Sequence, residues 1–279
     1  MIVAGFALLA VGAADLVRQF APRRWIGYLT VAIILLFLGS VSDALLPMIA
    51  ALAIGALWVW SMPSERRAPR GFWPAALFGV LVIGAVVWLG PRRETGLIGR
   101  IWELRSPFGE IPFDLAVLAF GAGVFLLESA NLVVRAALDG EHTWRPVDIV
   151  RPVTATESDP AATLSTAAMP TAVTAAETPD AVADPVALTG ATGPVDPRSG
   201  FKGGRLIGPL ERILVLILTL AAAYPILAAM LAAKGIVRFP EISRDGETGA
   251  RAEYFLVGSL VSWVIALGAA FLVWWAAHS

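Results

Sequence analysis

Glu128 follows a long apolar run and is the first candidate for chemistry in this chain. The run extends from Leu115 to Leu127, and Asn131 and Arg135 follow Glu128 at spacings of three and seven residues. In one helix these spacings place the three side chains on one face. If the apolar segment ends near Arg135, Glu128 lies about 10 Å inside it, where a carboxylate could bind a cation, relay a proton or lock its helix to a neighbour. If the segment ends earlier, Glu128 is instead solvated at an interface.

A second group of charged residues flanks the two C-terminal apolar segments. Its members are Arg205, Glu211 and Arg212 at the entry of the first segment, Lys234 and Arg238 at its exit, and Glu253 at the start of the second. We expect the first three at one end of the segment. At the opposite end we expect an ion pair between Glu253 and Lys234 or Arg238, because a carboxylate at a helix N-terminus is favoured. These charges could contact lipid headgroups or only anchor the helices at a membrane surface.

Other residue types that carry chemistry are scarce. The chain has no cysteine, and its two histidines, His142 and His278, lie outside the apolar segments. No zinc-protease, nucleophile-elbow or phosphate-loop motif occurs, so we predict neither a metal site nor a cofactor. Asp15 and Asp43 lie at the ends of apolar segments, where helix capping or a solvated turn accounts for them.

The composition is that of a membrane protein. Hydrophobic residues make up 57% of the chain and charged residues 15%, whereas soluble domains have about 45–50% and about 25%. The mean hydropathy is +0.74. A bilayer accepts such a surface if the backbone polar groups pair internally, as they do in helices. The net charge of −1 favours no nucleic-acid partner.

The apolar segments predict an all-α, polytopic transmembrane protein with about seven spans in a five-plus-two arrangement. A span needs about 17–25 apolar residues, and the candidates are 2–17, 25–41, 44–60, 73–90, 112–137, 208–235 and 254–276. Residues 25–60 are too long for one span, so a tight turn is predicted at Ser40–Asp43. Tyr224-Pro225 should kink the sixth span.

The loop at 91–111 allows two interpretations. Leu97, Ile101, Leu104 and Phe108 recur at helical spacing, which is typical of a short amphipathic helix in the membrane interface. The alternative is a loop that docks on the helices of its own chain.

A long segment without aromatic residues separates an N-terminal part of the chain from a C-terminal part. Residues 145–200 contain no aromatic residue, and between Arg151 and Arg198 there are six acidic residues and no basic one. Such a segment buries too little apolar area to offset its backbone entropy. We therefore predict an N-terminal transmembrane lobe at 1–140, a disordered acidic linker at 141–200 and a C-terminal helical hairpin at 201–279. The excess of arginine in 18–24, 61–72 and 138–209 favours a cytoplasmic linker.

Three short strings in the C-terminal part resemble a known but uncharacterised family of bacterial polytopic membrane proteins. The family pattern is similar to Gly-Arg-x-Ile-Gly-x-Leu-Glu-Arg, then Ala-Ala-Lys-x-x-x-Arg-Phe, then Glu-Tyr-x-Leu-x-Gly-x-Leu. The matching residues are Gly204, Arg205, Ile207, Gly208, Leu210, Glu211 and Arg212; Ala232, Ala233, Lys234, Arg238 and Phe239; and Glu253, Tyr254, Leu256, Gly258 and Leu260. The resemblance covers about 201–272. It implies a membrane fold and location but brings no activity.

Three classes of function follow from these patterns. We expect a non-enzymatic scaffold, assembly or signalling component of a bacterial plasma membrane, with lipids and a protein partner or a second copy of the chain as its contacts. One alternative is a small-solute or ion transporter that uses Glu128 and the break at Tyr224-Pro225. A second alternative is a lipid-modifying enzyme that uses the arginine and glutamate clusters.

Overall fold

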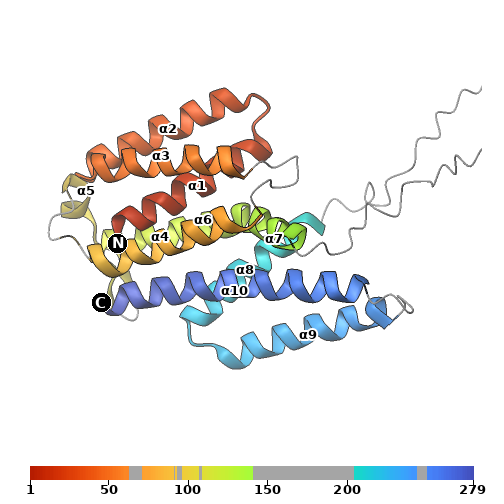
Figure 1. The fold of residues 1–279 in the computed structure, drawn as a ribbon. Helices are drawn as coiled ribbons and strands as arrows, with labels where there is room; N and C mark the ends of the chain where they lie inside the picture. Colours follow the sequence, from red (N-terminus) through yellow and green to blue (C-terminus); the bar gives the residue numbers. More distant parts are fainter. Residues whose placement is uncertain (63–70, 91, 93–95, 107–108, 141–203, 244–249) are drawn as a thin grey trace, which may run out of the picture. The chain divides into compact units, whose positions relative to one another are not determined.

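A computed structural model describes residues 1–62, 71–90, 92, 96–106, 109–140, 204–243 and 250–279 (Figure 1). Helices dominate this part of the chain, which confirms the all-α prediction. The helices are α1 (Ile2–Phe20), α2 (Arg24–Val41), α3 (Leu45–Ser61), α4 (Trp73–Leu89), α5 (Gly96–Ile101), α6 (Phe113–Leu127), α7 (Ser129–Gly140), α8 (Gly204–Leu220), α9 (Tyr224–Ser243) and α10 (Ala250–His278). A short antiparallel pair, β1 (Arg105–Ser106) and β2 (Gly109–Glu110), interrupts the series.

Helix α1 is the central helix, and glycines let it approach α6 closely. A Cβ atom at Gly12 would lie 2.8 Å from the backbone nitrogen of Phe125, and one at Gly121 would lie 2.5 Å from the carbonyl oxygen of Gly5. Any larger residue would force the two backbones apart. Small residues bring helices together in this way in membrane proteins.

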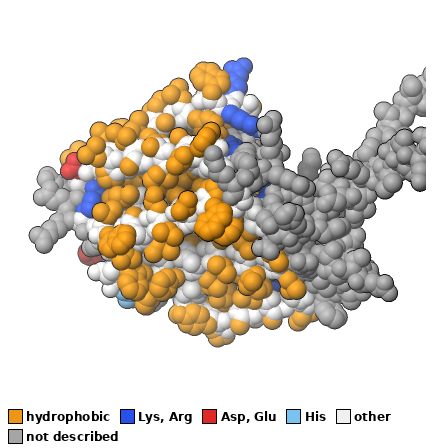
Figure 2. All heavy atoms as spheres, viewed as in Figure 1, with side chains coloured by type: hydrophobic (Ala, Val, Ile, Leu, Met, Phe, Trp, Pro, Cys, Tyr) orange, Lys and Arg blue, Asp and Glu red, His pale blue; other side chains and the backbone are white. Residues whose placement is uncertain are grey.

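Helices α2 and α4 bury few of their apolar side chains. The buried residues of α2 are Leu35 and Gly39, and those of α4 are Phe78, Val82 and Val86. Figure 2 shows hydrophobic side chains over most of one face of the described bundle.

The described helices do not support the predicted count of seven spans or their five-plus-two arrangement. By length and composition, three helices could cross a membrane, namely Ile2–Phe20, Arg24–Val41 and Phe255–His278. A fourth candidate is the pair α6 and α7, which is bent by 50° at Glu128. Helices α3 and α4 are apolar but have only 17 residues each.

The predicted sixth span, 208–235, is wrong as a single kinked helix. Helix α8 ends at Leu220, and α9 begins at Tyr224 and returns along it. Ala222 has φ of 53°, and the amides of Ala222 and Ala223 donate to the carbonyls of Thr219 and Leu218. This is the hydrogen-bond pattern that ends a helix on a left-handed residue. Pro225 therefore lies in the first turn of a new helix, where its missing N–H costs nothing.

The loop before α6 combines features of both interpretations. Leu97 and Ile101 are exposed, as an interfacial helix requires, but α5 ends at Ile101 and the chain continues as the β1–β2 pair. Ile98 and Trp102 pack against the core, and Trp102 Nε1 donates to the Ile111 carbonyl. Phe108 lies outside the described residues.

Helices on both sides of the predicted linker pack together. Residues Met1–Arg145 and Gly203–Ser279 form one compact unit, in which α6 and α7 contact α8 and α10. The predicted linker at 141–200 lies outside the described residues, so its disorder and the division into three parts stay predictions.

Candidate functional site

The break between α6 and α7 is the centre of the candidate site. Glu128 ends α6 with φ of −128° and ψ of −42°, and α7 leaves at 50°. The amide of Asn131 donates to the Glu128 carbonyl three residues before it, one residue closer than in an α-helix.

Arg212 of α8 caps this break from the side. Its Nη1 donates to the Leu126 carbonyl at 3.0 Å, its Nη2 to Asn131 Oδ1 at 2.6 Å and its Nε to Ser262 Oγ at 2.9 Å. The side chain is buried, and it connects four helices, α6, α7, α8 and α10. A positive charge is favourable at the C-terminus of α6, where the helix dipole is negative. The sequence predicted Arg212 either as a contact for lipid headgroups or as an anchor at the membrane surface, whereas the structure buries it between helices with 4% exposure.

Glu128 and Asn131 lie together as the sequence predicts, but Arg135 does not join them. Asn131 Nδ2 lies 3.3 Å from Glu128 Oε2. Glu128 is 7% exposed, so the alternative of a solvated Glu128 does not hold. Arg135 is exposed on α7, and the bend at Glu128 changes the direction of α7 relative to α6.

Glu211 and Lys234 form an ion pair that the sequence did not predict. Lys234 Nζ lies 2.6 Å from one carboxylate oxygen of Glu211 and 2.7 Å from the other, and Trp263 Nε1 donates to Glu211 at 2.8 Å. We had expected the two residues at opposite ends of one span. The α8–α9 hairpin brings them to the same level instead.

Three other predicted residues lie on described helices, but their side chains are outside the description. They are Arg205, Arg238 and Glu253. An ion pair from Glu253 to Arg238 stays a prediction, whereas Lys234 pairs with Glu211.

Asp15 forms a buried cluster that the sequence missed. Its Oδ2 accepts from Trp58 Nε1 at 2.8 Å and Ser129 Oγ at 2.6 Å, and its Oδ1 accepts from Arg18 at 3.1 Å. Arg18 also donates to the Met62 carbonyl. The carboxylate is 1% exposed, so Asp15 ties α1 to α3 and α7 and is neither a helix cap nor a solvated residue.

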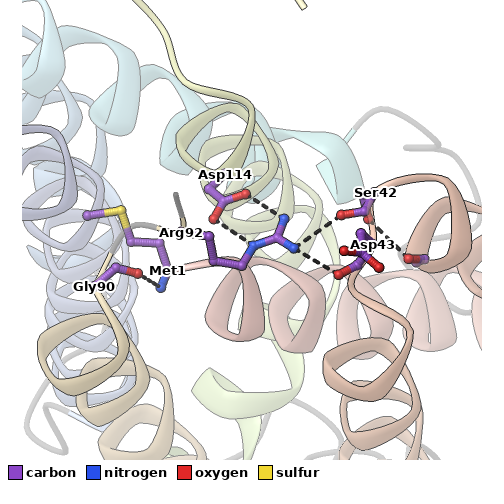
Figure 3. A network of polar contacts seen from close by, with 7 residues as sticks. Met1, Ser42, Asp43, Gly90, Arg92 and Asp114 are labelled. Atoms are coloured by element: carbon purple, nitrogen blue, oxygen red, sulfur yellow. Dashed lines mark hydrogen bonds and ion pairs between the residues drawn. The ribbon is translucent and has the colours of Figure 1, made fainter. Parts of the chain in front are cut away.

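A further cluster lies at the opposite end of the bundle (Figure 3). Arg92 binds both carboxylate oxygens of Asp114, at 2.8 and 3.1 Å, and donates to the carbonyls of Ser42 and Asp43. It therefore ties the start of α6 to the turn between α2 and α3. This role was not apparent from the sequence, because Arg92 and Asp114 are 22 residues apart.

The start of the chain joins the same end of the bundle. The Met1 amino group donates to the Gly90 carbonyl at 2.8 Å. Burial lowers the pKa of this amino group, while the nearby Asp114 carboxylate opposes that shift.

These clusters are built to hold helices together. In each cluster, the donors and acceptors of one helix are directed at those of its neighbours. Among the described residues, no group of three or more His, Cys, Asp or Glu side chains could hold a metal ion.

Comparison of the chain with protein-family models, curated proteins and solved structures gave no match. The resemblance of 201–272 to a bacterial membrane-protein family stays a prediction.

Proposed function

We propose that this chain is an integral, multi-pass protein of a bacterial plasma membrane that serves there as a non-enzymatic scaffold or assembly component. The observation that carries the proposal is the exposed apolar surface. On α2, Ile33, Ile34 and Phe37 are 58%, 59% and 71% exposed. At about 25 cal/mol per Å², hydrating such side chains along whole helices would oppose folding in water, and patches of this extent mark a membrane or protein contact.

A topology follows from the two ends of the bundle. We call the end where α7 finishes and α8 begins the linker end. Arg18 reaches Met62 there, so α1 and α3 also finish at this end. The cluster of Arg92 and the contact between Met1 and Gly90 mark the opposite end. In this proposal α1, α2, α3, α4 and the bent α6–α7 pair each cross the bilayer, with the 17-residue helices at its lower length limit.

The balance of basic residues supports a cytoplasmic linker end. The segments 18–24 and 62–72 carry three arginines each, and further basic residues flank α7, α8 and α9. At the opposite end, the turn at 42–44 has no basic residue and the segment 90–106 has four, of which Arg92 is bound to Asp114. An excess of arginine and lysine is typical of cytoplasmic loops.

The use of buried charge supports a scaffold. Ionisable groups in a membrane are costly unless they are paired. Asp15, Arg212 and Asp114 are each held by side chains or carbonyls of other helices. Such ties produce a rigid frame, and the predicted acidic linker would be the part available to a partner.

A pull-down from native membranes tests this function. The full chain, tagged after Ser279 and extracted in mild detergent, should recover a partner in fixed ratio. A matched chain that lacks 150–198 should remain in the membrane and lose the partner. Recovery of only lipid and copies of the same chain would contradict the scaffold.

One observation favours a transporter as a second candidate. Glu128 is buried at a broken helix, and transporters place ion sites at such breaks. Sodium or proton flux into proteoliposomes that is lost in Glu128→Gln, and retained in the exposed control Arg135→Gln, would support it. Equal flux in both variants and in empty vesicles would exclude it.

A further inference from the structure

We propose that α8 and α9 form a re-entrant hairpin that enters the bilayer from the linker end, contacts the acyl chains of that leaflet and turns back before the other surface. The inference rests on the membrane location proposed above. It adds that, of the helices described after the linker, α10 reaches further toward the opposite surface than the hairpin does.

The charged residues of the hairpin lie at one level. Glu211 of α8 pairs with Lys234 of α9, and Trp263 of α10 donates to the same carboxylate. Between Arg212 and Lys234 no residue is charged. A tryptophan beside an ion pair is typical of the membrane interface, so this level marks where the hairpin leaves the headgroup region.

The apolar arms are too short to cross the hydrocarbon. The outgoing arm covers 213–223 and the return arm 224–233. At about 1.5 Å per residue each arm reaches roughly 15 Å, about half of the hydrocarbon thickness of about 30 Å.

The alignment of α8 with α10 also indicates that the hairpin ends before the opposite surface. Along α8, Gly208 lies near Asn131 and Ile213 lies near Gly123, so α8 runs antiparallel to the α6–α7 pair. Gly258 at the start of α10 lies near Val134 and Leu138, and Ser262 contacts Arg212, so α10 runs in the direction of α8.

Helix α10 therefore extends beyond the hairpin. Helix α8 ends at Leu220, eight residues after Arg212 (220 − 212), while α10 ends at His278, sixteen residues after Ser262 (278 − 262). The turn continues the outgoing arm to Ala223, eleven residues after Arg212 (223 − 212), so α10 extends beyond the tip by five residues, about 8 Å of helix. In Figure 1 the α8–α9 turn lies part of the way along α10, whose end is marked C.

Most backbone N–H groups at the tip donate within the hairpin, which hydrocarbon favours. The amides of Ala221, Ala222 and Ala223 donate to carbonyls of α8. At the start of α9, Pro225 has no N–H, and the amides of Ile226 and Leu227 both donate to the Ala223 carbonyl.

The side chains of the tip fit acyl chains. Ile217, Tyr224 and Ile226 are 54%, 61% and 60% exposed. Between α9 and α10, a groove of about 340 Å³ is lined mainly by apolar residues such as Phe255 and Leu260. The groove lies on the linker side of the level of Glu211 and Lys234, so it would face headgroups and not the acyl chains at the tip.

Cysteine labelling of the full chain in membrane vesicles tests the hairpin, because the chain has no cysteine of its own. Single-cysteine variants at exposed Leu206 and Ile236 report the two bases, Tyr224 reports the tip, and Ser279 reports the end of α10. With a membrane-impermeant maleimide, we expect Leu206→Cys and Ile236→Cys to react from one side and Ser279→Cys from the other. Tyr224→Cys should react only after detergent is added.

Each other result overturns the inference. Labelling of Tyr224→Cys from the side of Ser279 would mean that the hairpin crosses completely, and labelling from the side of Leu206 would place the tip in water. A fluorophore at Tyr224→Cys should also be quenched more by lipids spin-labelled deep in the acyl chain than near the headgroup. Release of the protein by alkaline carbonate would instead refute the membrane location itself, so the two failures are distinguishable.

Discussion

Replacing Arg212 with methionine should loosen the whole bundle. The substitution Arg212→Met keeps an unbranched apolar stem of similar reach but removes the donors to Leu126, Asn131 and Ser262. Each hydrogen bond to a charged group contributes about 1.5–3 kcal/mol, whereas neutral ones between membrane helices average about 0.6 kcal/mol. Burying a guanidinium is itself costly. We therefore expect a loss of about 3 kcal/mol in the free energy of unfolding, below the roughly 4.5 kcal/mol lower limit for three charged bonds because the cost of burying the guanidinium is removed.

The matched control is Arg135→Met, because Arg135 is the same residue type on the adjoining helix but exposed. It should change stability by less than about 0.5 kcal/mol. Unfolding in mixed micelles of mild detergent and dodecyl sulfate, followed by tryptophan fluorescence, measures both variants. A double-mutant cycle of Arg212→Met with Ser262→Ala should give a coupling of about 1 kcal/mol. Equal stability of Arg212→Met and Arg135→Met would refute Arg212 as a tie between helices.

Three further substitutions test other contacts by the same unfolding assay. Asp15→Ala removes the acceptor of three donors and should lower the free energy of unfolding by about 3–5 kcal/mol. The control Glu110→Ala, whose side chain is 82% exposed, should change it little. Similar losses in the two variants would exclude a stabilising role of the Asp15 cluster. Gly121→Ala places a Cβ 2.5 Å from the Gly5 carbonyl and should lower the free energy of unfolding by about 1–3 kcal/mol. The control Gly79→Ala, whose Cβ meets nothing within 4 Å, should be neutral or stabilising. Unchanged stability of Gly121→Ala would contradict the close crossing of α1 and α6. Ala222→Gly relieves the left-handed conformation of a residue with φ of 53° and should stabilise the protein by about 1 kcal/mol. The neighbouring control Ala221→Gly should not stabilise it. A loss of stability in Ala222→Gly would contradict the left-handed turn.

The sequence predicted helix positions correctly where polar or turn residues lie at both ends of an apolar run. The predicted segments 25–41, 44–60 and 73–90 match α2, α3 and α4 within one residue at each end. The turn at Ser40–Asp43 was also found, because Ser and Asp favour turns.

The α8–α9 turn was missed because its one local signal, Pro225, predicts a kink, and the three residues before Tyr224 carry no turn signal. Ala221, Ala222 and Ala223 are strong helix formers, so the apolar pattern continues unbroken through them. Only the pairing of Glu211 with Lys234 reveals the reversal, and two charges 23 residues apart have no local signature.

The candidate site could be predicted only in part, since its contacts are non-local. Glu128 and Asn131 were found because their spacing is local and their apolar surroundings make them unusual. The partners of Asp15 lie 43 and 114 residues away, and those of Arg212 lie up to 86 residues away. Such distances depend on the helix packing, which glycines such as Gly12 determine and which hydropathy does not show.

The central claim is that lipid covers the exposed helices, and the most direct test is extraction of the full chain from membranes with alkaline carbonate. The protein should stay in the membrane pellet and enter the supernatant only with detergent. Photolabelling with a lipid-soluble carbene reagent should then mark α2 at Ile33, Ile34 or Phe37, which are exposed, and spare the central helix α1. Recovery of folded protein in the carbonate supernatant, with α2 unlabelled, would contradict the account.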